Sequence, residues 1–449
     1  MVPMRGLGAV VAMVSLGLFC ASAPLLPAAP ADHEDVLKRW SGKSPAELRA
    51  AAEAGNAEAQ HSLAHTFFKR PNATPGQLEE GIQWLQRAAD QNLAVAQAGL
   101  GMAYFESKIV AQNYPLGWKW MRAAAAQELP YALNYVGFAH LHGWGTRADA
   151  TEAVRWYQAA VAKGFPAAMT HLGWMTLQGK GGLAVDPAAG VKLIRQAADA
   201  GYAAAQVDLG LMLHRGHNLP KDAAAALAWF RKAAAQDFGH GQLHLANAYA
   251  LGTSVPQDLV AATDLYRKAA AQGNGDAAFA LAELYEAGEG SPRDTADSVN
   301  ALYERAAEAG HHRSAERLSQ RLRWGFAGPP DRLKACGWLC QAHVNRYGYG
   351  MSESQLLPQT DEESRQFAAL YQMHRRACQF RELPALLQMG RWCVEGTVAP
   401  VDLVEAYKWF TLARQRGDAT VEPELTKLRA RLTPEQIKDA ERRVANLNR

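Results

Sequence analysis

Histidines four positions apart are the first residues of this chain that could do chemistry. His61 and His65 share one face of a predicted helix, with Glu58 one turn earlier, and His240 and His244 repeat the spacing. Two imidazoles and a carboxylate on one helical face can bind zinc. A helical chain with 14 histidines also produces such pairs by chance. We therefore predict that the chain holds no metal ion and needs no cofactor.

Four cysteines near the C-terminal end could form disulfides. If the chain is exported, it meets an oxidising compartment, where an even number of cysteines permits pairing. Joining Cys378 to Cys340 or Cys393 would link neighbouring helices, although four cysteines allow more than one connectivity. Buried thiols are an alternative, and the spacing fits no common structural zinc motif. The four residues are Cys336, Cys340, Cys378 and Cys393.

The motifs of common enzyme classes are missing from the sequence. It has no Gly-x-x-x-x-Gly-Lys-Ser/Thr phosphate loop, no His-Glu-x-x-His helix, no Gly-x-Ser-x-Gly turn and no Cys-x-x-Cys pair. The glycine cluster at 179–182 follows no predicted strand, so we do not expect it to hold a phosphate. A formal net charge of +3 is too small to indicate nucleic acid as a partner. These observations favour a protein without catalytic activity.

A phrase that recurs every 35 to 37 residues organises the chain. Each copy has a large apolar anchor, small residues four and five positions later, and in many copies a glycine that ends the helix. A fixed period in this range is typical of a solenoid, which needs no single deep core. The anchors are Trp84, Trp120, Trp156, Leu193, Trp229, Leu265, Leu302, Trp338, Met373 and Trp409.

A second recurring element precedes most anchors by 20 or 21 residues. It is a Leu-Gly-like pair, as in Leu100-Gly101, Leu172-Gly173 and Leu209-Gly210. The constant offset predicts two helices in each repeat. Glycine inside a helix costs about 1 kcal/mol relative to alanine, so its recurrence predicts that the partner helix approaches closely there.

Together these residues resemble the Sel-one-like repeat family. Leu209-Gly210 through Trp229-Phe230-Arg231-Lys232-Ala233-Ala234 shows the likeness, which covers about residues 47 to 418. The resemblance implies a tetratricopeptide-like, all-α fold: a right-handed α-solenoid superhelix of about ten antiparallel helix pairs. It also implies an adaptor or scaffold for protein complexes, linked in exported bacterial members to envelope assembly and signalling. The family has no shared catalytic residues to transfer.

The regular spacing of the anchors, and the places where the repeat pattern breaks, suggest how the chain is divided. Between 343 and 382 the anchor position is kept, but no Leu-Gly pair precedes it and residues 345–360 contain many helix breakers. We interpret this stretch as a decayed repeat whose first helix is a loop. The predicted parts are a signal peptide (1–31), a polar leader (32–45), regular repeats (46–342), the degenerate repeat (343–382), a last repeat (383–418) and C-terminal capping helices (419–449).

The first residues have the pattern of a secretory signal. Arg5 precedes the apolar run 7–19, and Ala29-Pro30-Ala31 offers a small-x-small cleavage site. Cys20 follows bulky Phe19, which disfavours lipid attachment, so we do not expect a lipoprotein. No later stretch is long and apolar enough to span a bilayer. We predict an exported protein, in the periplasm, without an integral membrane span.

The resemblance also predicts a binding surface, because first helices line the concave face of tetratricopeptide-like solenoids. Residues two before, two after and five after the Leu column should point into that groove. Its N-terminal half is then apolar, while Asp276, Arg313 and Glu316 add charge to the other half. An exposed apolar strip of this kind marks an interface, whereas tight curvature would make it ordinary core. The predicted partner-binding residues are Met102, Phe105, Phe138, Leu141, Trp174, Leu177 and Leu211.

We therefore predict a non-enzymatic scaffold of the cell envelope that binds a protein partner, whose identity stays open, in its concave groove. One rival is an enzyme that acts on peptidoglycan or β-lactams, as described for some cysteine-rich relatives. In this chain the cysteines do not recur with the repeat, and no Ser-x-x-Lys acylation motif stands at a suitable place. A second rival is a structural spacer without a specific ligand.

Overall fold

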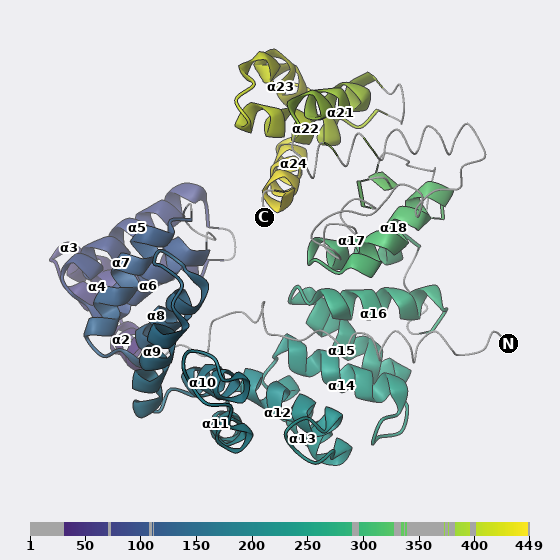
Figure 1. Cartoon of the computed structure of the whole chain (residues 1–449). Coiled ribbons are helices and arrows are strands. Elements are labelled where there is room, and N and C mark those ends of the chain that lie inside the picture. Colours follow the sequence, from purple (N-terminus) through teal and green to yellow (C-terminus); the bar gives the residue numbers. More distant parts are fainter. Residues whose placement is uncertain are drawn as a thin grey trace. The chain divides into compact units, whose positions relative to one another are not determined.

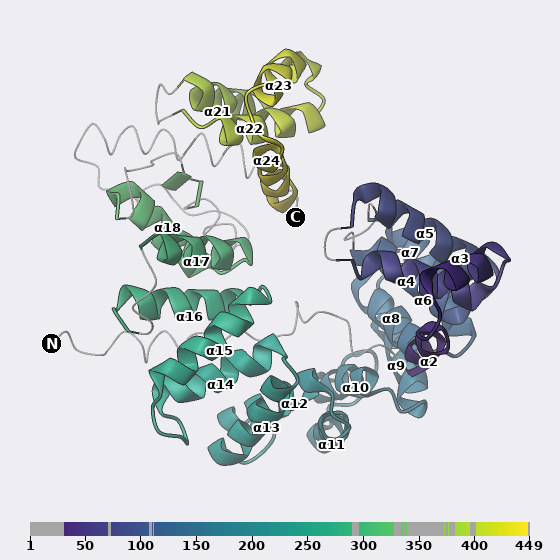
Figure 2. The same cartoon turned by 180° about the vertical axis from the view of Figure 1, so that it is seen from behind.

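The computed structural model confirms an all-α fold built from tandem helix pairs. It describes residues 31–70, 73–106, 112–289, 296–326, 382–395 and 401–447, with a few isolated positions between them. No strand occurs in those ranges. Successive helices pack against their sequence neighbours within each part of the chain (Figures 1 and 2).

The described chain divides into two compact units, with the boundary inside helix α14. The first unit holds α2 (Ala31–Trp40), α3 (Pro45–Glu53), α4 (Ala57–Phe68), α5 (Pro75–Asp90), α6 (Ala94–Glu106), α7 (Tyr114–Ala126), α8 (Pro130–His142), α9 (Ala150–Ala162), α10 (Pro166–Gln178), α11 (Pro187–Asp199), α12 (Ala203–Arg215) and α13 (Ala223–Ala235), followed by α14 (Gly239–Leu251). The second holds α15 (Leu259–Ala271), α16 (Gly275–Glu286), α17 (Ala296–Glu308), α18 (His312–Trp324), α21 (Leu383–Glu395), α22 (Leu403–Gln415), η3 (Ala419–Val421), α23 (Glu422–Arg429) and α24 (Pro434–Leu447).

In several repeats the first helix meets its second helix at a glycine, as the sequence predicts, whereas α4, α14 and α16 have alanine there (Ala64, Ala246 and Ala282). A Cβ added to Gly173 in α10 would lie 2.9 Å from the Gly190 carbonyl oxygen and 2.8 Å from Ile194 Cγ1, both in α11. Gly101 meets Met121 in the same way. Only glycine leaves room for this approach, which offsets its low helix propensity.

The second helix can also have a glycine, which leaves room for a large side chain of the first helix. A Cβ on Gly117 in α7 would lie 2.7 Å from Phe105 of α6, and one on Gly190 in α11 would lie 2.7 Å from Leu177 of α10. The contact in each of these pairs is therefore reciprocal: each helix offers a small residue where the other inserts a large one. This interlocking buries apolar surface without a deep common core.

In eight repeats the residue after the sequence anchor is a buried core residue. The anchors Trp120, Trp156 and Trp229 are half-buried, whereas Trp84 and Trp409 are themselves buried. The next residues are buried almost completely, with exposures from 0% to 5%: Leu85, Met121, Tyr157, Ile194, Phe230, Tyr266, Tyr303 and Phe410. The tryptophan rings instead cover the repeat edge, where Lys232 lies 3.8 Å from the Trp229 ring centroid and Arg87 lies 4.4 Å from that of Trp84.

A ladder of buried glutamines joins successive repeats. Gln60 of α4 donates to the Ala52 carbonyl of α3 over 2.9 Å and accepts from Gln91, at the end of α5, over 2.8 Å. Such a glutamine donates a hydrogen bond to a backbone carbonyl at a helix end, which would otherwise be buried without a partner. The same Gln–Gln bond joins Gln97 to Gln127, Gln206 to Gln236, and Gln242 to Gln272.

Local signals set the helix ends. Capping boxes form at Ser44 with Glu47 and at Thr433 with Gln436. Glycines that close first helices, such as Gly143 and Gly179, have φ of 74° and 64°, which glycine adopts without strain. Aspartates cap most second helices by accepting backbone N–H bonds, as Asp149 does from Thr151 and Glu152.

The C-terminal helix α24 is held to α22 by buried ion pairs. Glu405 pairs with Lys408 on its own helix and with Arg443 of α24, whose Nη1 lies 2.5 Å from Glu405 Oε1. Burial raises the pKa of Glu405, but Lys408 and Arg443 outweigh it and bring that pKa to about 2. Asp439 adds a 2.6 Å contact to Arg443, so α24 is fixed by charge as well as by apolar packing.

We expect Gly173→Ala to destabilise its own repeat by about 1–3 kcal/mol, because the added methyl group forces α10 away from α11. Gly76 provides the matched control, since a Cβ there meets nothing within 4 Å. Gly76→Ala should stabilise α5 by about 0.4–1 kcal/mol. Hydrogen exchange of the amides in α10, α11 and α5 measures both changes, and equal effects of the two substitutions would contradict the close-approach explanation.

Candidate functional site

Within each unit the first helices of the pairs present equivalent positions, which we call the A face of each helix. It is formed by the residues two before and two after the Leu column, together with the residue five before it. In α4 these positions are held by His61, His65 and Glu58, and in α16 by Phe279, Glu283 and Asp276. These side chains project from helices fixed by the glycine contacts, so the scaffold sets their positions.

The residues of the predicted apolar strip differ in how far they are exposed. Phe105 is only 2% exposed, so its expected place in an open groove is wrong. The column five after leucine faces the second helix instead, because Phe105 and Leu177 fill the gaps above Gly117 and Gly190. The remaining strip residues are half-buried: Met102, Phe138, Leu141, Trp174, Leu177 and Leu211.

Column residues two after leucine contact the next first helix. Trp174 Nε1 donates to Asp208 of α12 over 2.7 Å, and Phe138 lies 6.1 Å from the His171 ring. Met102 and the Tyr131 hydroxyl are also in contact. These half-buried side chains therefore link neighbouring repeats while keeping one edge on the A face. Whether they bind a partner remains a prediction.

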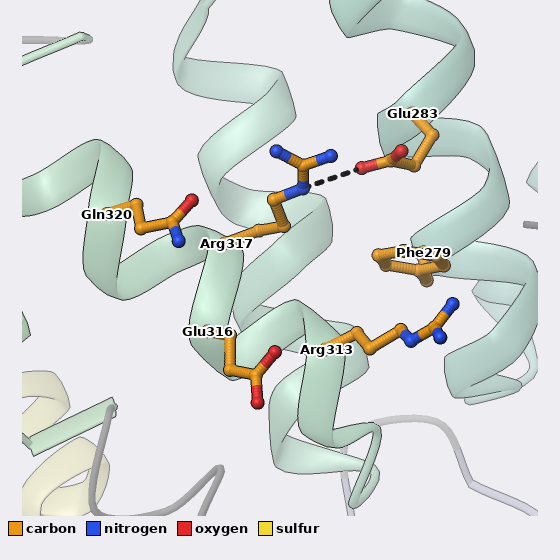
Figure 3. Close-up of a pocket in the computed structure, with 6 residues that line it drawn as sticks. All are labelled: Phe279, Glu283, Arg313, Glu316, Arg317 and Gln320. Carbon is orange, nitrogen blue, oxygen red and sulfur yellow. Dashed lines mark ion pairs between the residues drawn. The ribbon is translucent and has the colours of Figure 1, made fainter. Parts of the chain in front are cut away.

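A pocket opens on the A face between α16 and α18 (Figure 3). Its volume is about 270 Å³. Arg317 extends towards Glu283, and Phe279 lies between Glu283 and Arg313 (Figure 3). The sequence placed Arg313 and Glu316 on this face, and both line the pocket. The six lining residues are Phe279, Glu283, Arg313, Glu316, Arg317 and Gln320.

The floor of the pocket is aromatic. Phe279 is 2% exposed and its ring centroid lies 4.2 Å from that of His311. The Nδ1 atom of His311 is 2.8 Å from the Ser314 hydroxyl and accepts the Ser314 N–H, which caps α18. Burial, followed by His312 and Arg313, lowers the pKa of His311 to about 3. The floor is therefore uncharged at neutral pH.

One wall of the pocket carries a charged network. Glu283 Oε1 lies 3.4 Å from Arg317 Nε. The Tyr303 hydroxyl bonds to Glu283 and lies 2.8 Å from Glu286 Oε2, and burial together with these carboxylates raises the pKa of Tyr303. Behind it, Arg321 bonds to Glu286 and to Asn300. The network holds the carboxylates in place while Arg317 stays half exposed.

The structure adds a third histidine to the predicted His61–His65 pair. His33, from α2, lies with Nδ1 3.0 Å from His61 Nε2, and its ring centroid is 5.3 Å from that of His65. In the described part of the chain, no group of three or more His, Cys, Asp or Glu side chains is placed to hold a metal ion. His240 lies beside Phe238, at 5.5 Å between ring centroids.

The cysteine prediction reaches the described residues only at Cys393, which is buried in α21. Cys336, Cys340 and Cys378 lie outside those residues. Within the described ranges, no helix has both the length and the apolar character needed to cross a membrane.

Tandem antiparallel helix pairs with a recurring glycine contact define an α-solenoid of the helical-hairpin repeat class. The chain belongs to the Sel1 repeat family, whose members generally act as protein-interaction scaffolds. The family model matches residues 57–93, 94–129, 130–165, 166–202, 203–238, 239–274, 275–311, 312–342 and 383–418. It leaves residues 343–382 unmatched.

Solved structures of similar proteins carry the same kind of repeat. A protective antigen of uropathogenic Escherichia coli strains is 25% identical, with 90% of this chain and 94% of that chain covered and a TM-score of 0.43. A Sel1 repeat protein from Oxalobacter formigenes is 28% identical, with 55% and 96% covered and a TM-score of 0.46. Among proteins of curated function, none matches this sequence.

We expect the floor and the rim of the pocket to respond differently to substitution. Tyr303→Phe should destabilise the repeat by about 1–3 kcal/mol, because it removes the buried hydroxyl that lies between the Glu283 and Glu286 carboxylates. Arg317→Ala removes a half-exposed ion pair and should cost less than about 1 kcal/mol. Hydrogen exchange of α16 and α17 amides measures both, and an Arg317→Ala effect as large as that of Tyr303→Phe would contradict this description.

Proposed function

We propose that the chain is a non-enzymatic scaffold of the cell envelope that binds a segment of a protein partner on its A face. The observation that carries this proposal is the pocket between α16 and α18, which opens on that face. Members of the family generally bind proteins, which supports the same function.

The chemistry of the pocket suits a peptide side chain, and its volume is about 270 Å³. Phe279 offers an apolar floor, while Arg313 and Glu316 offer a donor and an acceptor at the rim. A peptide segment offers complementary groups: an apolar side chain for the floor, and backbone amides that can bond to the rim.

The rim can rearrange without disturbing the fold. The Glu283–Arg317 pair is half exposed on the arginine side, and such pairs contribute about 0–1 kcal/mol. A partner can therefore replace this contact at little cost. Glu283 itself stays anchored by Tyr303, so the acceptor remains in place.

Site-specific photo-crosslinking tests the proposed binding face. A benzoylphenylalanine at exposed Gln320 should give one defined crosslinked product in native cells, because the pocket contacts the partner. The matched control is the same residue at Lys268, which is exposed on the second helix α15. Arg313→Glu should reduce the Gln320 product at least tenfold without changing helicity.

Three outcomes would contradict the proposal or a part of it. Equal labelling from positions 320 and 268 would show non-specific contact. No product from position 320, with the protein folded and expressed, would favour the spacer. Turnover of peptidoglycan or a β-lactam by the purified chain would overturn the non-enzymatic part.

We also propose export to the periplasm, on the strength of Arg5, the apolar run 7–19 and the Ala29-Pro30-Ala31 site. These positions, up to residue 30, lie outside the described residues. The intact mass of the protein from its native envelope fraction should correspond to a chain that starts at Asp32. A chain that keeps Met1, or one that starts at Cys20 with an attached lipid, would contradict this prediction.

A further inference from the structure

Helix α2 lies on the A face, the surface where we propose that partners bind. His33 contacts His61 and His65, and Arg39 pairs with Glu58 over 3.1 Å. All three α4 residues occupy A-face positions. The predicted polar leader is thus a helix that covers the A face of the first repeat.

The contacts of α2 follow the spacing of a helix laid in a groove. His33, Val36 and Arg39 stand three residues apart, so they share one side of α2. Val36 is 4% exposed and belongs to the apolar cluster that contains Val95 and Ala98 of α6. An apolar residue flanked by polar contacts at this spacing is how amphipathic helices bind grooves.

We propose that the A face of α4 is a helix-binding surface, that α2 is its resident occupant, and that mild acid releases α2. The preferred partner is then an amphipathic helix with an apolar residue and, three positions later, a basic residue that reaches Glu58. The use of this surface by a partner rests on the function proposed above. The acid release of α2 does not, because it concerns contacts within this chain.

The histidine cluster supplies the acid sensitivity. Burial, followed by the neighbouring histidines, lowers the pKa of His61 to about 3, and burial, followed by His33 and Lys69, lowers that of His65 to about 4. Burial also lowers the pKa of His33, against the opposing charge of Glu34 and with that of Lys69. In the described part of the chain His61 Nδ1 is buried without a hydrogen-bond partner, so a proton there meets no acceptor.

The sign of the effect follows from these shifts. A histidine whose pKa is lowered in the docked state stabilises docking above its free pKa, near 6.5. That stabilisation is lost as the pH falls from about 6.5 towards 4. The other charged groups around α2 are paired with one another: Arg39 with Glu58 and Lys38 with Glu34.

Hydrogen exchange of α2 between pH 7.5 and pH 5 tests the release, with protection corrected for the intrinsic rate at each pH. Protection of the α2 amides should fall about tenfold or more, while that of α24 stays constant. The double variant His33→Gln and His65→Gln should reduce this pH response, and His61, which it retains, accounts for the part that remains. Both replaced residues are half-buried, and helicity at pH 7.5 checks that the variant folds. The matched control is His217→Gln, at an exposed histidine, which should keep the full response.

A second experiment tests the helix-binding surface itself. Val36→Asp should dislodge the resident α2, so a helix-stapled peptide of residues 31–43 should bind this variant at least tenfold more tightly than the unchanged chain at pH 7.5. Adding Glu58→Lys should abolish that binding.

Three results would overturn the inference. Constant α2 protection down to pH 5, or an equal fall in the double histidine variant, would show that the histidines do not control α2. Equal or absent peptide binding to the Val36→Asp variant would make α2 only a capping helix. Loss of crosslinking at Gln320 with α2 release intact would instead count against the proposed function alone.

Discussion

The interlocked contact between the two helices of a repeat is the constraint on which the rest of the structure depends. In five repeats a glycine on the first helix receives the large residue that follows the anchor, and in some repeats a glycine on the second helix receives a large residue in return. The five glycines are Gly101, Gly137, Gly173, Gly210 and Gly390. This contact fixes how closely and at which height two helices pack. Because it involves residues about 20 positions apart, each repeat carries its own packing instructions.

A contact of this kind leaves other columns free to vary. Once Gly173 and Ile194 have set one pair, nothing in that contact prescribes the residues two positions either side of the leucine column. Those positions hold Thr170 and Trp174 in α10 but Phe279 and Glu283 in α16. The A face can thus change from half-buried aromatics to a charged pocket without a change of fold. In a solenoid the A-face residues can vary independently of the fold, because stability comes from the contacts between neighbouring repeats.

Much of the fold could be predicted from the sequence, because the period, the Leu-Gly pairs and the anchors repeat together. The sequence does not, however, predict which side of each helix is buried in the core. Trp156 and Tyr157 are both large and apolar, and adjacent helix positions lie about 100° apart, so pattern alone does not say which one is core. Phe105 was assigned to the groove because the gap above Gly117 depends on a helix pairing that the column count ignores.

The candidate site was predictable only in part, for a physical reason of the same kind. Arg313 and Glu316 could be placed on the charged part of the A face from their register. The pocket also needs Tyr303, whose hydroxyl holds the carboxylates, and that bond joins residues from two different helices. The position of α2 was likewise hidden, since one buried residue, Val36, gives no periodic signal in a polar segment.

The two ends of the described chain are closed by different physical means, and this decides how each responds to acid. Helix α24 is held by Glu405, whose pKa is about 2 because Lys408 and Arg443 stabilise its charge. A lowered carboxylate pKa stabilises the folded state above about pH 4.5, and that contribution fades only below it. Helix α2 is held by histidines that must stay neutral, so its contribution fades below about pH 6.5. Between these values the histidine contacts of α2 weaken while the Glu405 pairs of α24 are retained, so the two terminal helices respond to acid differently.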